Sequence, residues 1–94
     1  MKLQSMPYAS ARVYKNTDGS MELYSYQTLV IFIDKDGWMD CTGTYSATTR
    51  KHIGAFMRNE ASKLSGHNLD YYTAKHCYEN NEKMNIYTGE VVPA

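Results

Sequence analysis

The chain has little cysteine, no net charge and no long apolar run, and each scarcity excludes a class of protein. Cys41 and Cys77 are too few and too far apart for a disulfide framework or a CxxC redox motif, so both thiols are expected to be reduced and buried. The longest apolar run, Leu29 to Ile33, is too short for a signal-peptide core or a membrane span. We therefore expect a cytoplasmic protein with no membrane partner.

The net charge and the length of the chain further limit the classes of protein to which it can belong. Lys and Arg together number 10, as do Asp and Glu, so no global field favours nucleic acid or an anionic membrane. A local basic patch remains compatible with nucleic acid. A chain of 94 residues is long enough for one modest core, so residues 1–94 are expected to form one small domain.

Tyrosine is abundant, with nine residues against two phenylalanines. A core this small cannot hide so many large rings, so some should remain exposed. Exposed tyrosine is typical of binding surfaces, because the ring supplies contact area at low entropic cost and its hydroxyl keeps a hydrogen bond.

Turn signals divide the first half of the chain into strands. Residues 16–20 (NTDGS) and 34–37 (DKDG) each place a glycine after an aspartate, which favours β-hairpins. Alternation of small apolar and polar side chains predicts a strand over residues 8–15. Residues 38–44 predict another strand, which returns antiparallel to the strand before the second turn.

Residues 21–33 are too long for one common strand, so a bend is expected near Ser25. The second half, residues 28–33 (TLVIFI), is apolar on both faces, which is typical of a central strand. The chain offers one covering layer, so we expect a homodimer formed through the sheet or its edge.

Helical spacing begins after Ser46, which is a good N-cap. A helix is predicted over residues 47–63, with its apolar stripe at Ile53, Phe56, Met57, Ala61 and Leu64. Glu60 falls near the middle of that stripe, so either the last turn frays or Glu60 has a partner.

The last third of the chain predicts less regular structure. A second helix is expected within residues 68–81, capped by Asn68 or Asp70, with Tyr71, Ala74 and Tyr78 on one side. From Met84 the tail alternates like a strand that either joins the edge of the sheet or reaches a neighbouring subunit. The predicted fold class is α+β, an antiparallel β-meander of three to four strands packed against one or two α-helices.

The start of the first helix is a candidate anion site, because its unpaired N–H groups and macrodipole favour negative ligands. Ser46, Thr48, Thr49, Arg50 and Lys51 surround it. His52 lies at the edge of the apolar face, where a hydrogen-bonded structural histidine is commoner than a ligand or a base. The alternative is structural. Tyr45 then packs at the corner, Ser46 only caps the helix, and the cations are ordinary solvated charges.

No motif in the sequence indicates catalytic or metal-binding residues. The histidines and cysteines match no zinc spacing, and a calcium loop aligned on Gly37 would place Phe32 at its first ligand position. No serine or cysteine is marked as part of a nucleophile–base–orienter trio. We therefore expect no enzyme activity, metal or cofactor.

Two kinds of partner fit the aromatic residues. Arg12, Tyr14, Tyr24 and Tyr26, with the helix-start cations, would stack on bases and bind phosphates of a nucleic acid. A protein partner would instead use the tyrosines and Trp38 as contact anchors, without needing a basic surface. The candidate binding residues are Tyr24, Tyr26, Trp38, Tyr45, Ser46, Thr48, Arg50, Lys51 and His52.

The segments SYQT (25–28), LVIFI (29–33) and GTYSATTRKHIGAFMRN (43–59) resemble a group of small uncharacterised proteins of bacteriophages and mobile elements of Gram-positive bacteria. The shared pattern is S-Y-x-T, strand, turn, strand, then Y-S-x-T-T-x-x-H-I-x-x-F, and it covers about the middle third of the chain. The resemblance implies a setting in which small proteins occlude a host protein. Inhibitors of defence nucleases, including anti-CRISPR proteins, belong to that setting.

Overall fold

Residues with positive φ set the first turns of the fold. The computed structural model describes residues 2–5, 10–44 and 46–94. Gly19, at φ +95°, and Gly37, at φ +94°, turn the two predicted hairpins. Between them, Tyr26 adopts φ +57° just after Ser25, so the expected break near Ser25 is confirmed.

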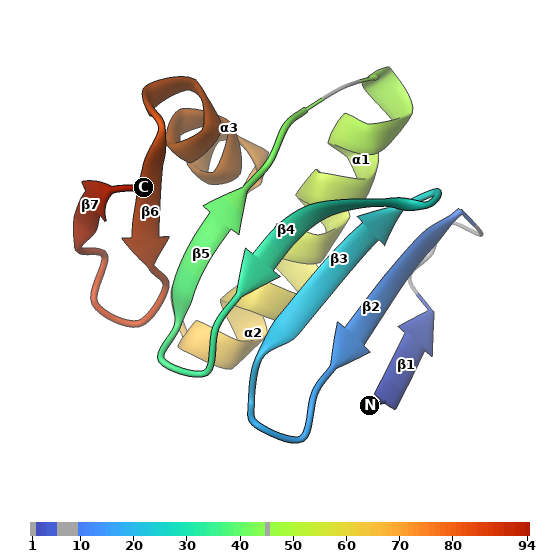
Figure 1. The fold of residues 1–94 in the computed structure, drawn as a ribbon, viewed down its shortest axis with the longest axis horizontal. Coiled ribbons are helices and arrows are strands. Elements are labelled where there is room, and N and C mark those ends of the chain that lie inside the picture. Colours follow the sequence, from blue (N-terminus) through green and yellow to red (C-terminus); the bar gives the residue numbers. More distant parts are fainter. Residues whose placement is uncertain (1, 6–9, 45) are drawn as a thin grey trace.

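The sheet is antiparallel, and its strands follow one another in chain order (Figure 1). Six of them run from β2 to β7, and β1 adds a seventh at the edge beside β2. The strands are β1 (Lys2–Ser5), β2 (Ala11–Lys15), β3 (Met21–Ser25), β4 (Thr28–Ile33), β5 (Trp38–Cys41), β6 (Glu82–Asn85) and β7 (Val91–Pro93).

The α+β class and the antiparallel meander are confirmed, but the predicted count of three to four strands is wrong. The tail contributes a hairpin rather than one strand, because the chain turns after Asn85, whose Oδ1 accepts from the N–H groups of Tyr87 and Thr88. Thr88 therefore lies in a turn and not in the alternating strand expected for it. β1 lies in a short segment without a clear alternating pattern and was not predicted.

β4 contains a bulge that explains its continuous apolar sequence. Leu23 pairs with Ile31, but the next residue of β3, Tyr24, pairs with Leu29, so Val30 has no partner in the register. Val30 and Ile31 are consequently both buried, although neighbouring strand residues normally alternate between faces. β5 ends at Cys41, earlier than the predicted residue 44.

The helical layer consists of a first helix that contains a π-helical segment and a shorter second one. α1 (Ala47–Phe56) continues through a π-helical segment, η1 (Met57–Ala61), into α2 (Ser62–Ser65), and the following Gly66 has φ +77°. The predicted helix over residues 47–63 is therefore confirmed with a small extension. α3 (Tyr71–Asn80) is capped by Asp70, whose carboxylate accepts from the Thr73 N–H.

The buried side of α3 differs in part from the expected one. Ala74 is buried as expected, but Tyr78 is exposed and Cys77 takes the second buried position. Residues three apart lie on one face of a helix, so the pair 74 and 77 packs on the sheet. Cys41 and Cys77 are both free and buried, which confirms the expectation for the thiols.

The helices cover one face of the sheet and leave the other uncovered by helix (Figure 1). The covered face carries the core side chains Ala11, Val13, Met21, Leu23, Ile31, Ile33, Met39 and Cys41. By alternation, the open face carries Arg12, Tyr14, Glu22, Tyr24, Leu29, Phe32, Trp38 and Asp40. No helix of the described residues is long and apolar enough to span a membrane.

Candidate functional site

A buried polar network joins the start of α1 to the sheet. The Ser46 side chain caps α1 and accepts from the Thr49 N–H at 3.2 Å. The Ser25 hydroxyl lies 3.0 Å from Thr49 Oγ1 and 2.8 Å from His52 Nδ1. The other ring nitrogen of His52, Nε2, lies 3.2 Å from the Ser10 hydroxyl. Residues that stood out as a motif in the sequence are therefore bonded to one another.

This network shows where His52, expected at the edge of the apolar face of the helix, lies in the fold. His52 is completely buried, and Thr49 and Ser25 are buried beside it. Burial lowers the pKa of the His52 imidazole, because desolvation disfavours its charged form. A buried histidine with both ring nitrogens hydrogen-bonded orients α1 on the sheet and does not reach a partner at the surface.

The remaining residues of the helix start are exposed. Thr48, Arg50 and Lys51 all point to solvent, while the Ser46 hydroxyl is engaged with Thr49. Tyr45 lies outside the described residues. Within the described part of the chain, Arg50 and Lys51 take part in no ion pair. The structure thus leaves Arg50 and Lys51 exposed as surface charges.

The open face of the sheet contains a hollow of about 500 Å³. It is lined by Arg12, Tyr14, Glu22, Tyr24, Tyr26 and Gln27. The rings of Tyr14 and Tyr24 meet edge to face, with centroids 5.5 Å apart and planes at 81°. Such contacts between aromatic side chains hold both rings in one orientation.

Tyr26 connects the hollow to the start of α1. Its side chain is 54% exposed, and its ring centroid lies 5.9 Å from that of the buried His52. Tyr24 and Tyr26, which the sequence singled out, are therefore brought together. Trp38 lies on the same face but at the far end of β5, beside the turn whose Asp34 carboxylate accepts from the Trp38 N–H.

Charge on the open face is mixed. Among the described residues of β2 to β5 that point to this face, Arg12 is the cation, and Glu22 and Asp40 are the carboxylates. Arg12 and Glu22 both line the hollow. The surface therefore presents a donor and an acceptor side by side rather than a basic stripe.

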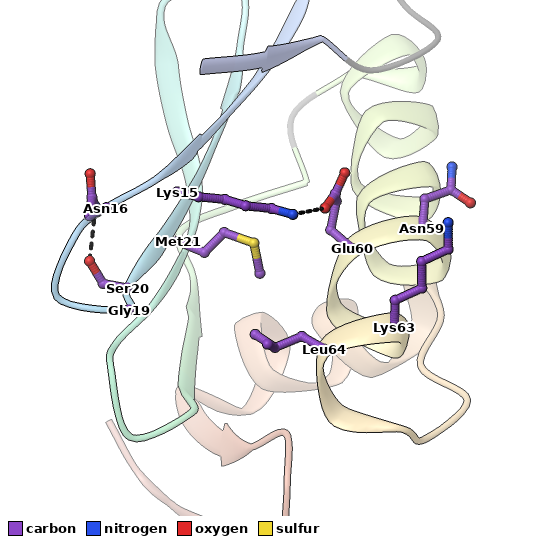
Figure 2. A pocket seen from close by; sticks show the side chains of 9 residues that line it. All are labelled: Lys15, Asn16, Gly19, Ser20, Met21, Asn59, Glu60, Lys63 and Leu64. Atoms are coloured by element: carbon purple, nitrogen blue, oxygen red, sulfur yellow. Dashed lines mark hydrogen bonds and ion pairs between the residues drawn. The ribbon is translucent and has the colours of Figure 1, made fainter. Parts of the chain in front are cut away.

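A second cleft, which the sequence did not indicate, lies between the β2–β3 hairpin and the η1 and α2 segments of the first helix (Figure 2). Lys15 crosses it, and its ammonium pairs with the Glu60 carboxylate at 3.0 Å. The expected partner of Glu60 is thus found. The position of Glu60 in the middle of an apolar helix stripe indicated that it has a partner. The sequence did not indicate that this partner is Lys15.

Metal-binding and reactive groups are sparse in the described part of the chain. No cluster of three or more His, Cys, Asp or Glu side chains there is arranged to hold a metal ion. Burial raises the pKa of the Cys41 thiol to about 11 and also raises that of Cys77. Neither thiol is therefore activated as a nucleophile at neutral pH.

The fold and these sites define a small α+β protein with a helix-covered sheet. The chain belongs to a family of unknown function, DUF8033, whose model matches residues 1–73. No curated protein and no solved structure is significantly similar to it. The matched range contains the polar network, the open-face hollow and the second cleft, and it ends within α3.

Proposed function

We propose that this chain is a non-catalytic protein-binding module of a phage or mobile element that acts through the open face of its sheet. The observation that carries the proposal is the hollow on that face, in which the Tyr14–Tyr24 pair lies beside Arg12. Its partner would be a host or phage protein. The proposed role is inhibition of a host defence system such as a CRISPR nuclease, in the cytoplasm of the host.

Rigid support of the rings favours a protein contact. Tyr14 and Tyr24 lie within β2 and β3, where Tyr14 pairs with Glu22 and Tyr24 pairs with Arg12. Aromatic side chains held on strands lose little entropy on binding and bury a large area, and tyrosine and arginine are enriched among residues that dominate binding energy. No metal or cofactor is needed for such an activity.

Apolar side chains extend the surface beyond the hollow. Leu29, Phe32 and Trp38 are half-buried on the same face, which no helix covers. This arrangement supports the proposal that a second copy of the chain packs here as a homodimer when the other partner is absent. Light scattering at micromolar concentration is expected to give the dimer mass. A monomer mass would reject the homodimer and leave the protein-binding proposal intact.

The alternative is a small nucleic-acid-binding protein that uses Arg12, Tyr24 and Tyr26 together with Arg50 and Lys51. The Tyr26–His52 contact favours it, because it places an exposed ring next to the helix that carries these cations. Glu22 in the same hollow disfavours it, since phosphate binding depends on accumulated positive charge. The protein partner is therefore preferred.

Capture from host lysate, with and without nuclease, distinguishes the two. The tagged wild-type chain is expected to retain a protein partner after nuclease treatment, and the Tyr24→Ala/Tyr26→Ala variant is expected to lose it. Tyr72→Ala is the matched control, because Tyr72 is 70% exposed on α3, in the helical layer. Recovery of nucleic acid, or of proteins that nuclease releases, would establish the alternative instead.

A challenge experiment tests the defence role separately. Hosts that carry a defined CRISPR or restriction system are infected with and without expression of the chain. Protection of the phage by the wild type, with loss in the Tyr24→Ala/Tyr26→Ala variant and not in Tyr72→Ala, is expected. Absence of protection in every system tested would reject inhibition of host defence.

A further inference from the structure

The π-helical segment η1 changes which side of the first helix faces the sheet. A π turn holds one more residue than an α turn, so residues after it are rotated relative to an uninterrupted helix. Glu60 lies in this segment, with its side chain 17% exposed and paired with Lys15 of β2. Single π turns within α-helices are frequent at functional sites. The π-helical segment and the Lys15–Glu60 ion pair therefore coincide at one place in this fold.

The cleft at this place has the size of a small-molecule site. Its volume is about 390 Å³, and pockets for small ligands span roughly 300 to 1,000 Å³. The hairpin side consists of Lys15, Asn16, Gly19, Ser20 and Met21, and the helix side consists of Asn59, Glu60, Lys63 and Leu64. It lies between the helical layer and the hairpin, so it is separate from the hollow on the open face.

The walls of the cleft are apolar where the two sides meet. Figure 2 shows the Met21 and Leu64 side chains directed into the same space, on one side of the Lys15–Glu60 pair. Leu64 is 46% exposed, although it ends the apolar stripe of the helix. Covering that leucine would remove apolar surface from water, which favours an apolar ligand group here.

The charges around the cleft are unequal. Lys15 and Lys63 are the cations of the lining, and Glu60 is its carboxylate. Glu60 neutralises Lys15, whereas Lys63 is exposed and has no ion pair within the described residues. The Glu22 carboxylate belongs to the open face of the sheet and accepts from Asn16 Nδ2 at 3.2 Å. One positive charge of the lining, that of Lys63, is therefore left without a carboxylate from the lining. A ligand with one negative charge would neutralise it.

We propose that this cleft binds a small amphipathic monoanion, with its apolar part between Met21 and Leu64 and its carboxylate or phosphate head at the mouth of the cleft. Figure 2 shows the Lys63 side chain directed along the helix toward Asn59, and it would turn from there to meet the head. The Lys15–Glu60 pair bridges the hairpin side and the helix side of the cleft, beside the apolar part. This site does not depend on the proposed protein partner.

Octanoate is the probe, and octylammonium is the control of equal length and opposite charge. Octanoate is expected to shift the methyl NMR signals of Met21 and Leu64 and to raise the melting temperature, and octylammonium is expected to do neither. Equal effects of the two probes, or no shift of these signals by millimolar octanoate, would overturn the proposal.

Variants locate the site. Lys63→Glu is expected to raise the dissociation constant of octanoate by about tenfold, since it replaces an attraction with a repulsion. Leu64→Ser is expected to raise it by about fivefold through lost apolar contact. Lys75→Glu makes the same charge change on α3, outside the lining of the cleft, and should change the dissociation constant by less than about twofold. An equal effect of Lys63→Glu and Lys75→Glu would show that octanoate binds by general electrostatic attraction and would overturn the site.

Discussion

His52 Nδ1 lies 2.8 Å from the Ser25 hydroxyl, a residue 27 positions earlier in the chain. This hydrogen bond links α1 to the end of β3, where the chain turns into β4. Thr49 also bonds to Ser25, and Ser10 bonds to His52. The helix, the end of β3 and the segment before β2 therefore meet at one buried polar cluster. The distinctive residues of the middle of the chain therefore first specify how the helix is seated.

Removal of the Ser25 hydroxyl tests this role. Ser25→Ala leaves His52 Nδ1 and Thr49 Oγ1 without that partner in a buried environment, and we expect a loss of about 1–3 kcal/mol in the free energy of unfolding. Urea denaturation measures it. Thr48→Ala, at an exposed position on the same helix, should change stability by less than about 0.5 kcal/mol. Equal stability of the two variants would contradict a structural role for the network.

The lowered pKa of His52 predicts a dependence of stability on pH. The unfolded chain carries a histidine with a pKa of about 6.5, whereas the folded protein keeps His52 neutral to lower pH. The unfolded state therefore binds more protons below about pH 6.5, and the contribution of His52 to stability is complete above that pH and declines as the pH falls.

Urea midpoints between pH 8 and pH 5 measure this decline. Comparison with His52→Gln isolates it, because His67 and His76 are retained in both proteins and their titration cancels in the difference. The wild type is expected to lose more stability than the variant across this interval. Parallel pH profiles would show that His52 titrates alike in the folded and unfolded states.

Gly37 combines a restricted backbone with a close neighbour. Its φ is +94°, and a Cβ placed there would lie 2.4 Å from Cδ2 of the Tyr87 ring. Gly37→Ala is expected to destabilise the fold by about 1–3 kcal/mol, through backbone strain and displacement of the ring. Gly89→Ala is the control, since Gly89 has φ +78° and open space around it.

The comparison separates strain from steric conflict. Thermal unfolding should show a larger loss for Gly37→Ala than for Gly89→Ala, and Tyr87→Ala in the Gly37→Ala background should recover part of the difference. Identical losses at the two glycines would mean that the Tyr87 ring moves away without cost.

The buried thiols are expected to resist alkylation in the folded protein. With a pKa of about 11, Cys41 is ionised in about one molecule per thousand at pH 8, and its side chain is also buried. Iodoacetamide followed by mass spectrometry should leave Cys41 and Cys77 unmodified in native buffer and modify both in concentrated urea. Rapid modification in native buffer would indicate local opening between α3 and β5.

Much of the fold follows from local signals in the sequence. Glycine after aspartate predicted the turns at Gly19 and Gly37, and Ser46 predicted the start of the first helix, because these choices depend on the backbone of a few residues. The number of strands was harder to predict from the sequence. β1 and the C-terminal hairpin are short, and short strands owe their existence to neighbours that a single sequence does not reveal.

The candidate sites were predicted in part, for the same reason. The exposure of Tyr26, Arg50 and Lys51 follows from their polar groups, but the burial of His52 depends on Ser10 and Ser25, which lie in distant segments. The cleft at η1 requires the π turn and the Lys15–Glu60 contact. Both arise from tertiary packing, so the sequence showed only an acidic residue in an apolar stripe.

The sequential strand order has a consequence for how the chain folds. Each neighbouring pair of strands from β1 to β5 is joined by a short connection, but β5 and β6 are separated by residues 42–81, which form the entire helical layer. Closing that long segment costs the most chain entropy, so pairing of β6 with β5 is expected to be the late event in folding. Trp38, the single tryptophan, pairs with Asn85 in this ladder. Its fluorescence in stopped-flow refolding will therefore follow the docking of the C-terminal hairpin, while far-ultraviolet circular dichroism follows the earlier hairpins and helices.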